Sequence, residues 1–221
     1  RAWFLQEAPR RRVEHMADSI SHLDAYRVAA REQGPGFAAT LWGSPETQSL
    51  RFDIIDNMCG GLADTRVLDL GCGDGALYQW LGERGTLPAA YLGIDALDEQ
   101  VKRAREVHAG ATFGHLDVSK ASALPSGFDW VVISGTLNTM DDATTLHVLD
   151  LAWGTAAIGL VFNFLSDRPG LKWQSRPLGP ARRHHLPELM AWALERTPLV
   201  ACRQDYLDGH DATLVMHRSD A

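Results

Sequence analysis

Three glycines at alternate positions follow a short apolar segment in the stretch LDLGCGDG, residues 68–75. Because glycine has no side chain, such a loop lets backbone N–H groups and the start of a helix approach a ligand closely. Asp69 lies two residues before Gly71, where its carboxylate would oppose a pyrophosphate but favour an ammonium or sulfonium cation. The stretch therefore predicts a nucleotide-like ligand and favours one that carries positive charge.

The glycine loop alone does not identify this ligand. No Gly-Lys-Ser/Thr follows it, so the triphosphate-binding P-loop does not fit. Gly71, Gly73 and Ala76 do fit the permissive dinucleotide pattern G-x-G-x-x-A, and Asp95 lies about twenty residues further on. A nicotinamide dinucleotide therefore stays open beside a sulfonium ligand with a zwitterionic tail.

Acidic residues end the next two predicted strands as well. Asp95 closes YLGID, where its carboxylate can accept hydrogen bonds from both hydroxyls of a ribose. Asp117 and Val118 in HLDVS can hold an adenine, the carboxylate at its amino group and the valine against its ring. Together with Asp69, these positions favour an adenosine bound at one edge of a sheet.

Length and composition narrow the class of protein. The chain has 221 residues, 45% of them hydrophobic, which fits a single globular domain, and its formal net charge is −7. This negative balance disfavours nucleic acid as a partner and makes a small molecule the expected one. Three distant cysteines without a C-x-x-C pair predict reduced thiols in the cytoplasm and no metal site. The longest apolar run, residues 152–165, is too short to span a bilayer, so we expect no membrane partner.

The elements that position these residues follow from the periodicity. Apolar residues at three-to-four spacing predict a helix over residues 11–32, and Ser44-Pro45 opens a second one that ends at Gly60-Gly61. Short apolar strands then alternate with helices, which predicts parallel pairing with right-handed crossovers. The predicted parallel strands are 67–70, 91–94, 112–114, 130–134 and 158–165. Two last runs, 199–206 and 213–218, have no helix between them and predict a hairpin.

Four stretches together resemble the class I S-adenosylmethionine-dependent methyltransferases. VLDLGCGDG is similar to the first motif of that family, YLGID to the second, HLDV to its adenine contact and FDWVVISGTLN to its fourth strand with the active-site loop. The resemblance covers about residues 40–218. It implies an α/β fold with a doubly wound, seven-stranded, mostly parallel sheet, an antiparallel C-terminal hairpin strand and N-terminal helices.

The resemblance implies S-adenosyl-L-methionine as the cofactor and S-adenosyl-L-homocysteine as the product. It places Asp69 at the methionine part, Asp95 at the ribose, and Asp117 at the adenine. Arg51 is expected to pair with the methionine carboxylate. The cofactor-binding residues implied in this way are Trp42, Gln48, Arg51, Asp69, Gly71, Cys72, Gly73, Asp95, Ala96, Asp117, Val118, Ser134 and Gly135.

The acceptor is less well specified. Residues 134–138 lack the Asp/Asn-Pro-Pro-Tyr/Phe pattern with which family members hold planar amino groups of adenine or glutamine, so those substrates are disfavoured. Asn138 is a candidate to orient a polar acceptor, with capping of the next helix as the alternative. In RPLGPARRHH, residues 176–185, Arg182 and Arg183 are candidates to bind an anionic acceptor, with a solvated basic loop as the alternative. His184 is the candidate general base.

These observations predict a small-molecule O- or N-methyltransferase of secondary metabolism, in which the cofactor supplies the activated methyl group and the protein aligns the acceptor. Methylation of RNA or protein, a non-catalytic cofactor-binding subunit and, less favoured, an NAD-dependent oxidoreductase are the alternatives. Residues 1–60 are expected to form a helical N-terminal extension that acts as a lid or packs on the sheet edge. Residues 61–221 are expected to form the Rossmann-like core of the single domain.

Overall fold

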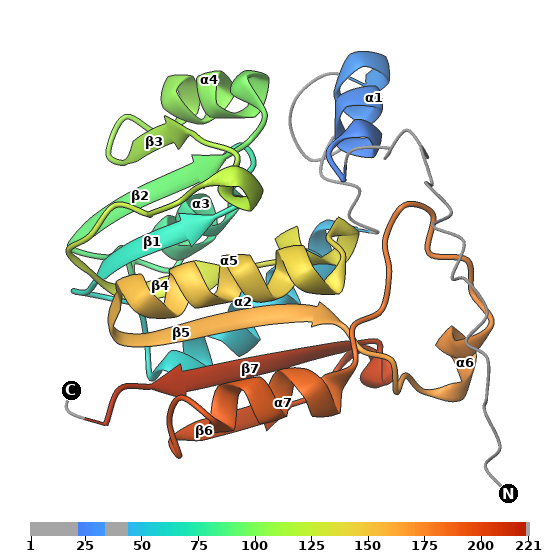
Figure 1. Ribbon diagram of the computed structural model, residues 1–221. Coiled ribbons are helices and arrows are strands. Elements are labelled where there is room, and N and C mark those ends of the chain that lie inside the picture. The colour runs from blue at the N-terminus through green and yellow to red at the C-terminus, as the bar shows by residue number, and fades with distance from the viewer. Residues whose placement is uncertain (1–21, 34–43, 220–221) are drawn as a thin grey trace, which may run out of the picture.

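A seven-stranded sheet forms the centre of the molecule in the computed structural model, which describes residues 22–33 and 44–219 (Figure 1). The strand order is β3-β2-β1-β4-β5-β7-β6. The strands are β1 Arg66–Leu70, β2 Ala90–Asp95, β3 Thr112–His115, β4 Phe128–Ile133, β5 Ala156–Leu165, β6 Val200–Arg203 and β7 Asp211–His217. The helices are α1 Asp24–Gln33, α2 Pro45–Cys59, α3 Ala76–Glu83, α4 Asp98–Val107, α5 Asp142–Thr155, α6 Leu171–Gln174 and α7 Leu186–Leu194.

The pairing confirms the predicted fold class. β1 to β5 are parallel, whereas β7 pairs antiparallel with both β5 and β6. The predicted C-terminal hairpin is therefore present, and its last strand lies between β5 and β6. α6 was not predicted, because a four-residue helix is too short to produce a hydrophobic period.

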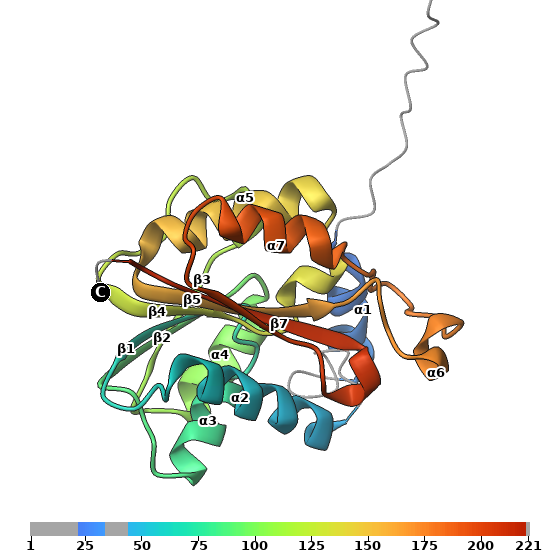
Figure 2. The ribbon, with the colours of Figure 1, turned by 90° about the horizontal axis from the view of Figure 1, so that it is seen from below.

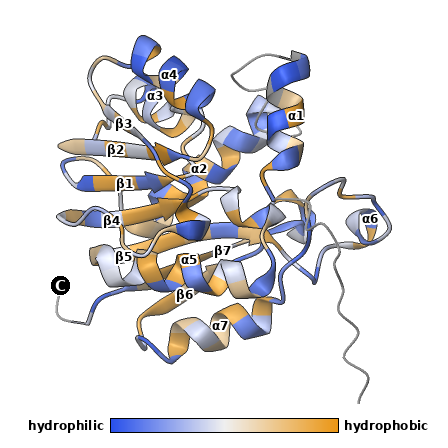
Figure 3. Ribbon diagram, turned by 45° about the horizontal axis from the view of Figure 1, so that its top comes forward, coloured by the Kyte–Doolittle hydropathy of each residue, from blue (hydrophilic) through white to orange (hydrophobic). Residues whose placement is uncertain are grey.

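Helices cover both faces of the sheet (Figure 2). α5 and α7 lie against one face, and α2, α3 and α4 lie against the other. Successive strand residues point to opposite faces, so Val131 and Ile133 join one apolar cluster while Trp130 and Val132 join the other. Apolar residues accordingly follow the central strands in Figure 3. This two-sided burial explains why these strands are almost continuously apolar.

α2 begins and ends where its sequence indicates. Ser44 is the N-cap and accepts a hydrogen bond from the Thr47 amide, with Pro45 at the first helical position. Gly60 follows the last turn in the left-handed conformation, with φ 75°. The predicted helix over residues 11–32 is described only from Asp24 onward, where it forms α1, and its first part lies outside the described residues.

The direction of β7 matters for the site. Because β7 runs against its neighbours, its first residue lies at the same edge as the carboxyl ends of β1 to β5, and Asp211 pairs in register with Leu165, the last residue of β5. The turn before β7 is thereby brought to the cavity described below. Within the described ranges, none of the helices has the length and apolar character needed to cross a bilayer.

Candidate cofactor and acceptor site

A cavity of about 400 Å³ opens at the carboxyl ends of the parallel strands. It is centred where the strand order reverses, between β1 and β4, which is where ligands bind in doubly wound sheets. Its volume falls in the range of small-molecule sites. Most of the residues that the sequence predicted for the cofactor line this cavity: Gln48, Arg51, Asp69, Gly71, Cys72, Gly73, Asp95, Ala96, Asp117, Val118, Ser134 and Gly135. Trp42 lies outside the described residues.

Asp69, on β1, places a buried carboxylate at the cavity. It is 3% exposed, and the Tyr91 hydroxyl donates a hydrogen bond to it. Burial raises the pKa of Asp69 to about 7, and the Tyr91 hydrogen bond offsets only part of that rise. A cationic ligand group would favour the ionised carboxylate, so the position suits the ammonium end of an amino-acid moiety.

The glycine loop connects β1 to α3 and has the backbone that only glycine adopts readily. Gly71 has φ 78°, and a Cβ atom there would lie 2.0 Å from the Thr136 hydroxyl oxygen. The Gly73 amide donates to the Asp95 carboxylate at 2.9 Å, and the Leu97 amide donates to the other oxygen of that carboxylate at 2.8 Å. The loop and the end of β2 are therefore tied into one rigid wall.

Asp95 and Asp117 continue the row of carboxylates that begins with Asp69, at the same edge of the sheet. Burial raises the pKa of Asp95, and the amides of Leu97 and Gly73 counteract part of that rise. Asp117 caps a short 3₁₀ helix, residues 118–120, by accepting from the Ser119 amide, and Val118 beside it is 5% exposed. Both carboxylates keep lone pairs beyond these bonds, so they can accept hydrogen bonds from hydroxyl or amino groups of a ligand.

The loop after β4 completes the wall opposite the glycine loop. The Gly135 backbone amide donates to the side-chain oxygen of Asn163 at 2.7 Å, and the side-chain nitrogen of Asn163 donates to the Ser134 hydroxyl at 3.3 Å. Asn138 also lines the cavity, but its side-chain oxygen accepts from the Leu165 amide at 2.9 Å. The Asn138 oxygen thus holds the loop to the end of β5, which leaves the amide nitrogen for any contact with a ligand.

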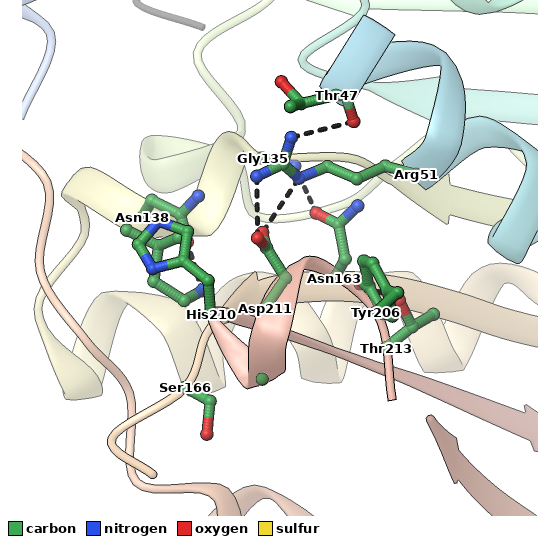
Figure 4. A network of polar contacts seen from close by, with 12 residues as sticks. Thr47, Arg51, Gly135, Asn138, Asn163, Ser166, Tyr206, His210, Asp211 and Thr213 are labelled. Carbon is green, nitrogen blue, oxygen red and sulfur yellow. Dashed lines mark hydrogen bonds and ion pairs between the residues drawn. The ribbon is translucent and has the colours of Figure 1, made fainter. Parts of the chain in front are cut away.

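Arg51 links α2 to β7 at the rim of the cavity. Its guanidinium donates to both carboxylate oxygens of Asp211, at 2.8 and 2.7 Å, and to the Thr47 carbonyl oxygen (Figure 4). The two side chains of this pair are 6% and 0% exposed. The positive charge expected to meet a methionine carboxylate is therefore already balanced by a buried acid.

Three of the four acceptor candidates, Arg182, Arg183 and His184, lie apart from the cavity lining. His184 is 2% exposed, and its Nε2 hydrogen-bonds the Leu137 carbonyl oxygen at 2.9 Å. Arg182 pairs with Asp142 at 2.9 Å on the surface. Arg183 donates to the carbonyl oxygens of Ser166 and Trp173. Each of these side chains is held by groups of the protein itself, and none of them lines the cavity.

Other residues line the cavity that the sequence did not single out. α1 contributes Tyr26, preceded by His22 and Leu23, and Trp173, Arg176 and His210 lie at the opposite end. The basic character of the segment before α7 did indicate that this region faces a ligand, but Arg176 rather than Arg182 lies at the cavity. No sequence pattern indicated that His210 belongs to the site, because it reaches the cavity only through the antiparallel direction of β7.

Cys72 and Ala96 also line the cavity. Burial raises the pKa of the Cys72 thiol well above its usual range, so this sulfur is not an activated nucleophile. Cys72 fills space beside Gly93, where any Cβ atom would lie 2.8 Å from its sulfur. The Ala96 carbonyl oxygen bonds the His115 ring at 3.1 Å.

Comparison with known proteins agrees with this geometry. Residues 67–157 match the model of a family described as "Methyltransferase domain". A ubiquinone biosynthesis O-methyltransferase from Pseudoalteromonas translucida is 34% identical over 110 residues, which are 47% of this chain and 45% of that protein. One from Nitrosomonas europaea is 40% identical over 60 residues, 27% of this chain and 24% of that protein. The chain thus spans less than half the length of these curated relatives.

Solved structures share the fold over almost the whole chain. The magnesium protoporphyrin IX methyltransferase ChlM of Synechocystis PCC 6803 with bound SAH has a TM-score of 0.61 at 19% identity, covering 89% of this chain and 94% of that one. The N-methyltransferase NodS of Bradyrhizobium japonicum WM9, in complex with S-adenosyl-L-homocysteine, has a TM-score of 0.64 at 17% identity, covering 88% and 98%. With the family match to residues 67–157 and the seven-stranded sheet, these comparisons agree with the resemblance predicted from the sequence: residues 67–157 match a methyltransferase domain, and the chain has the Rossmann-like fold of the solved methyltransferases.

Proposed function

We propose that this chain is an S-adenosylmethionine-dependent methyltransferase that transfers a methyl group to an oxygen atom of a small molecule. The observation that carries the proposal is the row of carboxylates, Asp69, Asp95 and Asp117, which lie at one cavity from the ends of β1, β2 and the segment after β3. The names of the curated relatives, ubiquinone biosynthesis O-methyltransferase, favour oxygen over nitrogen as the acceptor atom. A role in secondary metabolism and a cytoplasmic location remain predictions from the sequence.

The residues present fit this cofactor. Asp69 is a buried carboxylate with a raised pKa, which a neighbouring ammonium group would stabilise in its ionised form. Asp95 offers carboxylate oxygens to ribose hydroxyls, and Asp117 with Val118 offers an acceptor and an apolar contact to adenine. Two structural neighbours, ChlM and DhpI, were crystallised with S-adenosylmethionine or S-adenosylhomocysteine, which supports the same assignment.

Bound S-adenosylmethionine supplies a methyl group that is already activated toward displacement. The protein's task is then to align an acceptor oxygen with the methyl group and to exclude water. Tyr26 of α1 and Leu23 just before this helix line the cavity from one side, and Leu178, Pro180 and Ala181 line it from the other. We propose that α1, within the N-terminal extension, acts in this way as a cover, and that Asn138 orients the acceptor through its amide nitrogen.

Calorimetry with S-adenosylhomocysteine and with NADH tests the cofactor. We expect S-adenosylhomocysteine to bind and NADH not to bind. Gly71→Ala is expected to lower the affinity at least about tenfold, because the new methyl group would displace Thr136 and the loop.

Gly85→Ala is the matched control for that variant. Gly85 has a similar φ, 71°, but no atom lies within 4 Å of a Cβ there. Both variants carry the conformational cost of the left-handed region, about 1–2 kcal/mol, and only the first disturbs the cavity. Binding of NADH alone, or equal loss of affinity in both variants, would contradict the proposal. A screen of cell extract for transfer of labelled methyl groups would then identify the acceptor.

A further inference from the structure

The end of the cavity away from the three carboxylates has a different chemistry. We call it the acceptor end and define it by residues 173–181 and His210. Trp173, Arg176 and His210 supply its polar groups, and prolines, Leu178 and Ala181 supply its apolar wall. The acidic residues that line the cavity come from β1, β2 and the segments after β1 and β3, which β4 and β5 separate from β7 and His210: Asp69, Asp74, Asp95 and Asp117. Donors and cations therefore face whatever molecule occupies the acceptor end.

His210 is fixed in position by several contacts. Its ring stacks on Trp173, with ring centres 4.0 Å apart and planes 20° apart. Its carbonyl oxygen accepts from the Ser166 amide at 3.0 Å, and its Nδ1 lies 3.3 Å from a guanidinium nitrogen of Arg183. Arg183 also donates to the Trp173 carbonyl oxygen at 2.9 Å, so one side chain holds both members of the ring stack.

The backbone before His210 is strained. Leu207, Asp208 and Gly209 have φ values of 46°, 57° and 69°, so two residues with side chains lie in the left-handed region. Such conformations cost about 1–3 kcal/mol each and persist where the surrounding structure requires them, often at ligand sites. Here the strained turn reverses the chain between β6 and β7 and places His210 at the cavity.

The contact with Arg183 determines the tautomer of His210. A guanidinium group only donates hydrogen bonds, so Nδ1 must accept and cannot carry a hydrogen. The neutral ring then carries its hydrogen on Nε2. Within the described part of the chain, no protein group hydrogen-bonds Nε2, and His210 lines the cavity. Nε2–H is therefore a donor available to a ligand rather than a proton acceptor.

We propose that His210 binds the methyl acceptor by donating its Nε2–H to an anionic oxygen of that molecule, a carboxylate or a phenolate, and that Arg183 is the positioning residue that fixes the tautomer. This inference rests on the proposed function, because it identifies the neighbouring end of the same cavity as the acceptor site. Arg176, which also lines this end, adds a cation beside the same oxygen. The acceptor class is thus an anionic molecule with an apolar body.

Charged groups from every neighbouring element act on this ring. Asp211 on β7 raises the pKa of His210, whereas burial, Arg183, Arg51 on α2 and Arg176 after α6 lower it. Burial is the largest of these effects, so the pKa of His210 lies below its usual value. The ring consequently stays neutral near pH 7 and keeps the tautomer that Arg183 requires.

Nitrogen NMR of the histidine-labelled protein tests the tautomer without any need for activity. We expect the His210 signals to show hydrogen on Nε2 and not on Nδ1. In Arg183→Met the donor to Nδ1 is absent, so we expect a mixture of the two tautomers. A wild-type ring with hydrogen on Nδ1 would overturn the proposal.

Ligand binding is tested with benzoate and with 4-nitrophenol above its pKa, each in the presence of S-adenosylhomocysteine. We expect at least one of these anions to bind and to shift the Nε2–H signal, and benzamide, which has the shape of benzoate without its charge, to bind about tenfold more weakly. The two anions distinguish a carboxylate site from a phenolate site.

Variants at position 210 separate a donor from a merely structural ring. Gln places an N–H near the position of Nε2, and Asn places one near Nδ1. His210→Gln is expected to keep anion binding within a few-fold, whereas His210→Asn and His210→Ala are expected to lose about tenfold. Equal binding in all four proteins, or no anion binding by the wild type, would overturn the inference. If S-adenosylhomocysteine fails to bind but the tautomer and the anion results hold, the proposed function fails and the assignment of His210 stands.

Discussion

Asp69 is the residue whose environment most clearly anticipates a ligand. A carboxylate that is 3% exposed and has a pKa of about 7 is costly to ionise in the protein without its ligand. The hydroxyl of Tyr91 donates one hydrogen bond to it but brings no positive charge. A bound cation would supply that charge, so part of the folding free energy is given up at this position in favour of ligand binding.

The stability of the ligand-free protein should record this cost. The pKa of Asp69 is higher in the folded than in the unfolded chain. The contribution of this residue to the free energy of unfolding is therefore full below about pH 4 and is lost as the pH rises toward 7. A difference of about three pKa units corresponds to at most about 4 kcal/mol. Asp69→Asn cannot ionise, so we expect its stability relative to the wild type to increase by a few kcal/mol between about pH 4 and pH 8. Urea unfolding at both pH values measures this change.

Cofactor affinity should move in the opposite direction in the same variant. Asp69→Asn is expected to bind S-adenosylhomocysteine at least about tenfold more weakly, because the amide does not attract the ammonium group. Tyr91→Phe is the companion variant: loss of the hydroxyl raises the pKa of Asp69 further and should steepen the pH dependence of stability. A wild type whose stability does not fall over this pH range would refute the role given to Asp69.

At the scale of elements, the buried ion pair between Arg51 and Asp211 joins the first helix of the core to the last strand. The two residues are 160 positions apart in the sequence, and α2 packs against both β5 and β7. Arg51 lines the cavity, and Asp211 follows His210 in the sequence and lies beside it in Figure 4. The ion pair therefore fixes both the helix that carries Arg51 and the turn that carries His210.

Loss of this ion pair should lower the free energy of unfolding strongly. We expect Asp211→Asn to lower the free energy of unfolding by about 3–5 kcal/mol, because the guanidinium would be left buried without its counter-charge. The exposed pair of Arg203 and Asp205, at 3.0 Å, is the control: Asp205→Asn should leave the free energy of unfolding nearly unchanged, because solvent screens this pair. The double variant Arg51→Met/Asp211→Leu should recover much of the loss. Urea unfolding of the four proteins measures these values, and equal effects of the two Asn variants would contradict the buried role.

At the scale of the whole molecule, the cavity lies between the sheet edge and α1. Leu23 and Tyr26 line it from α1 and the turn before it, and His22 lies 4.0 Å from Asp117 at the end expected to hold adenine. Tyr26 places α1 in direct contact with this cavity. A ligand in the cavity should therefore stabilise this helix.

Hydrogen exchange tests whether α1 covers the bound ligand. We expect the amides of residues 24–33 to exchange several-fold more slowly with S-adenosylhomocysteine bound, because the ligand fills the space under the helix. α7, which packs on one face of the sheet away from the cavity, is the internal control and should not change. Identical exchange of α1 with and without ligand would show that it only packs against the core.

The end of the cavity with the three carboxylates was predictable, because neighbouring residues in the sequence determine its structure. Gly71 follows its strand within the same short segment, and the left-handed backbone that it needs is a property of that position. Asp69, Asp95 and Asp117 lie at or just beyond the ends of predicted strands, so parallel pairing alone brings them to one edge. Periodicity and turn residues were enough to predict both the strands and the hairpin.

The acceptor end depended on contacts between distant parts of the chain. His184 and Arg182 belong to the same basic segment as Arg176, and only the tertiary structure decided that Arg176 faces the cavity while His184 is buried against Leu137. His210 and Asp211 reach the site because β7 inserts antiparallel between β5 and β6. The amino-acid sequence by itself determined that the glycine turn and the three carboxylates meet at one edge of the sheet, since strand ends and glycine turns are set by neighbouring residues. Which side chains line the proposed acceptor end was decided by tertiary packing, because burial and charge pairing act between residues that the sequence keeps far apart.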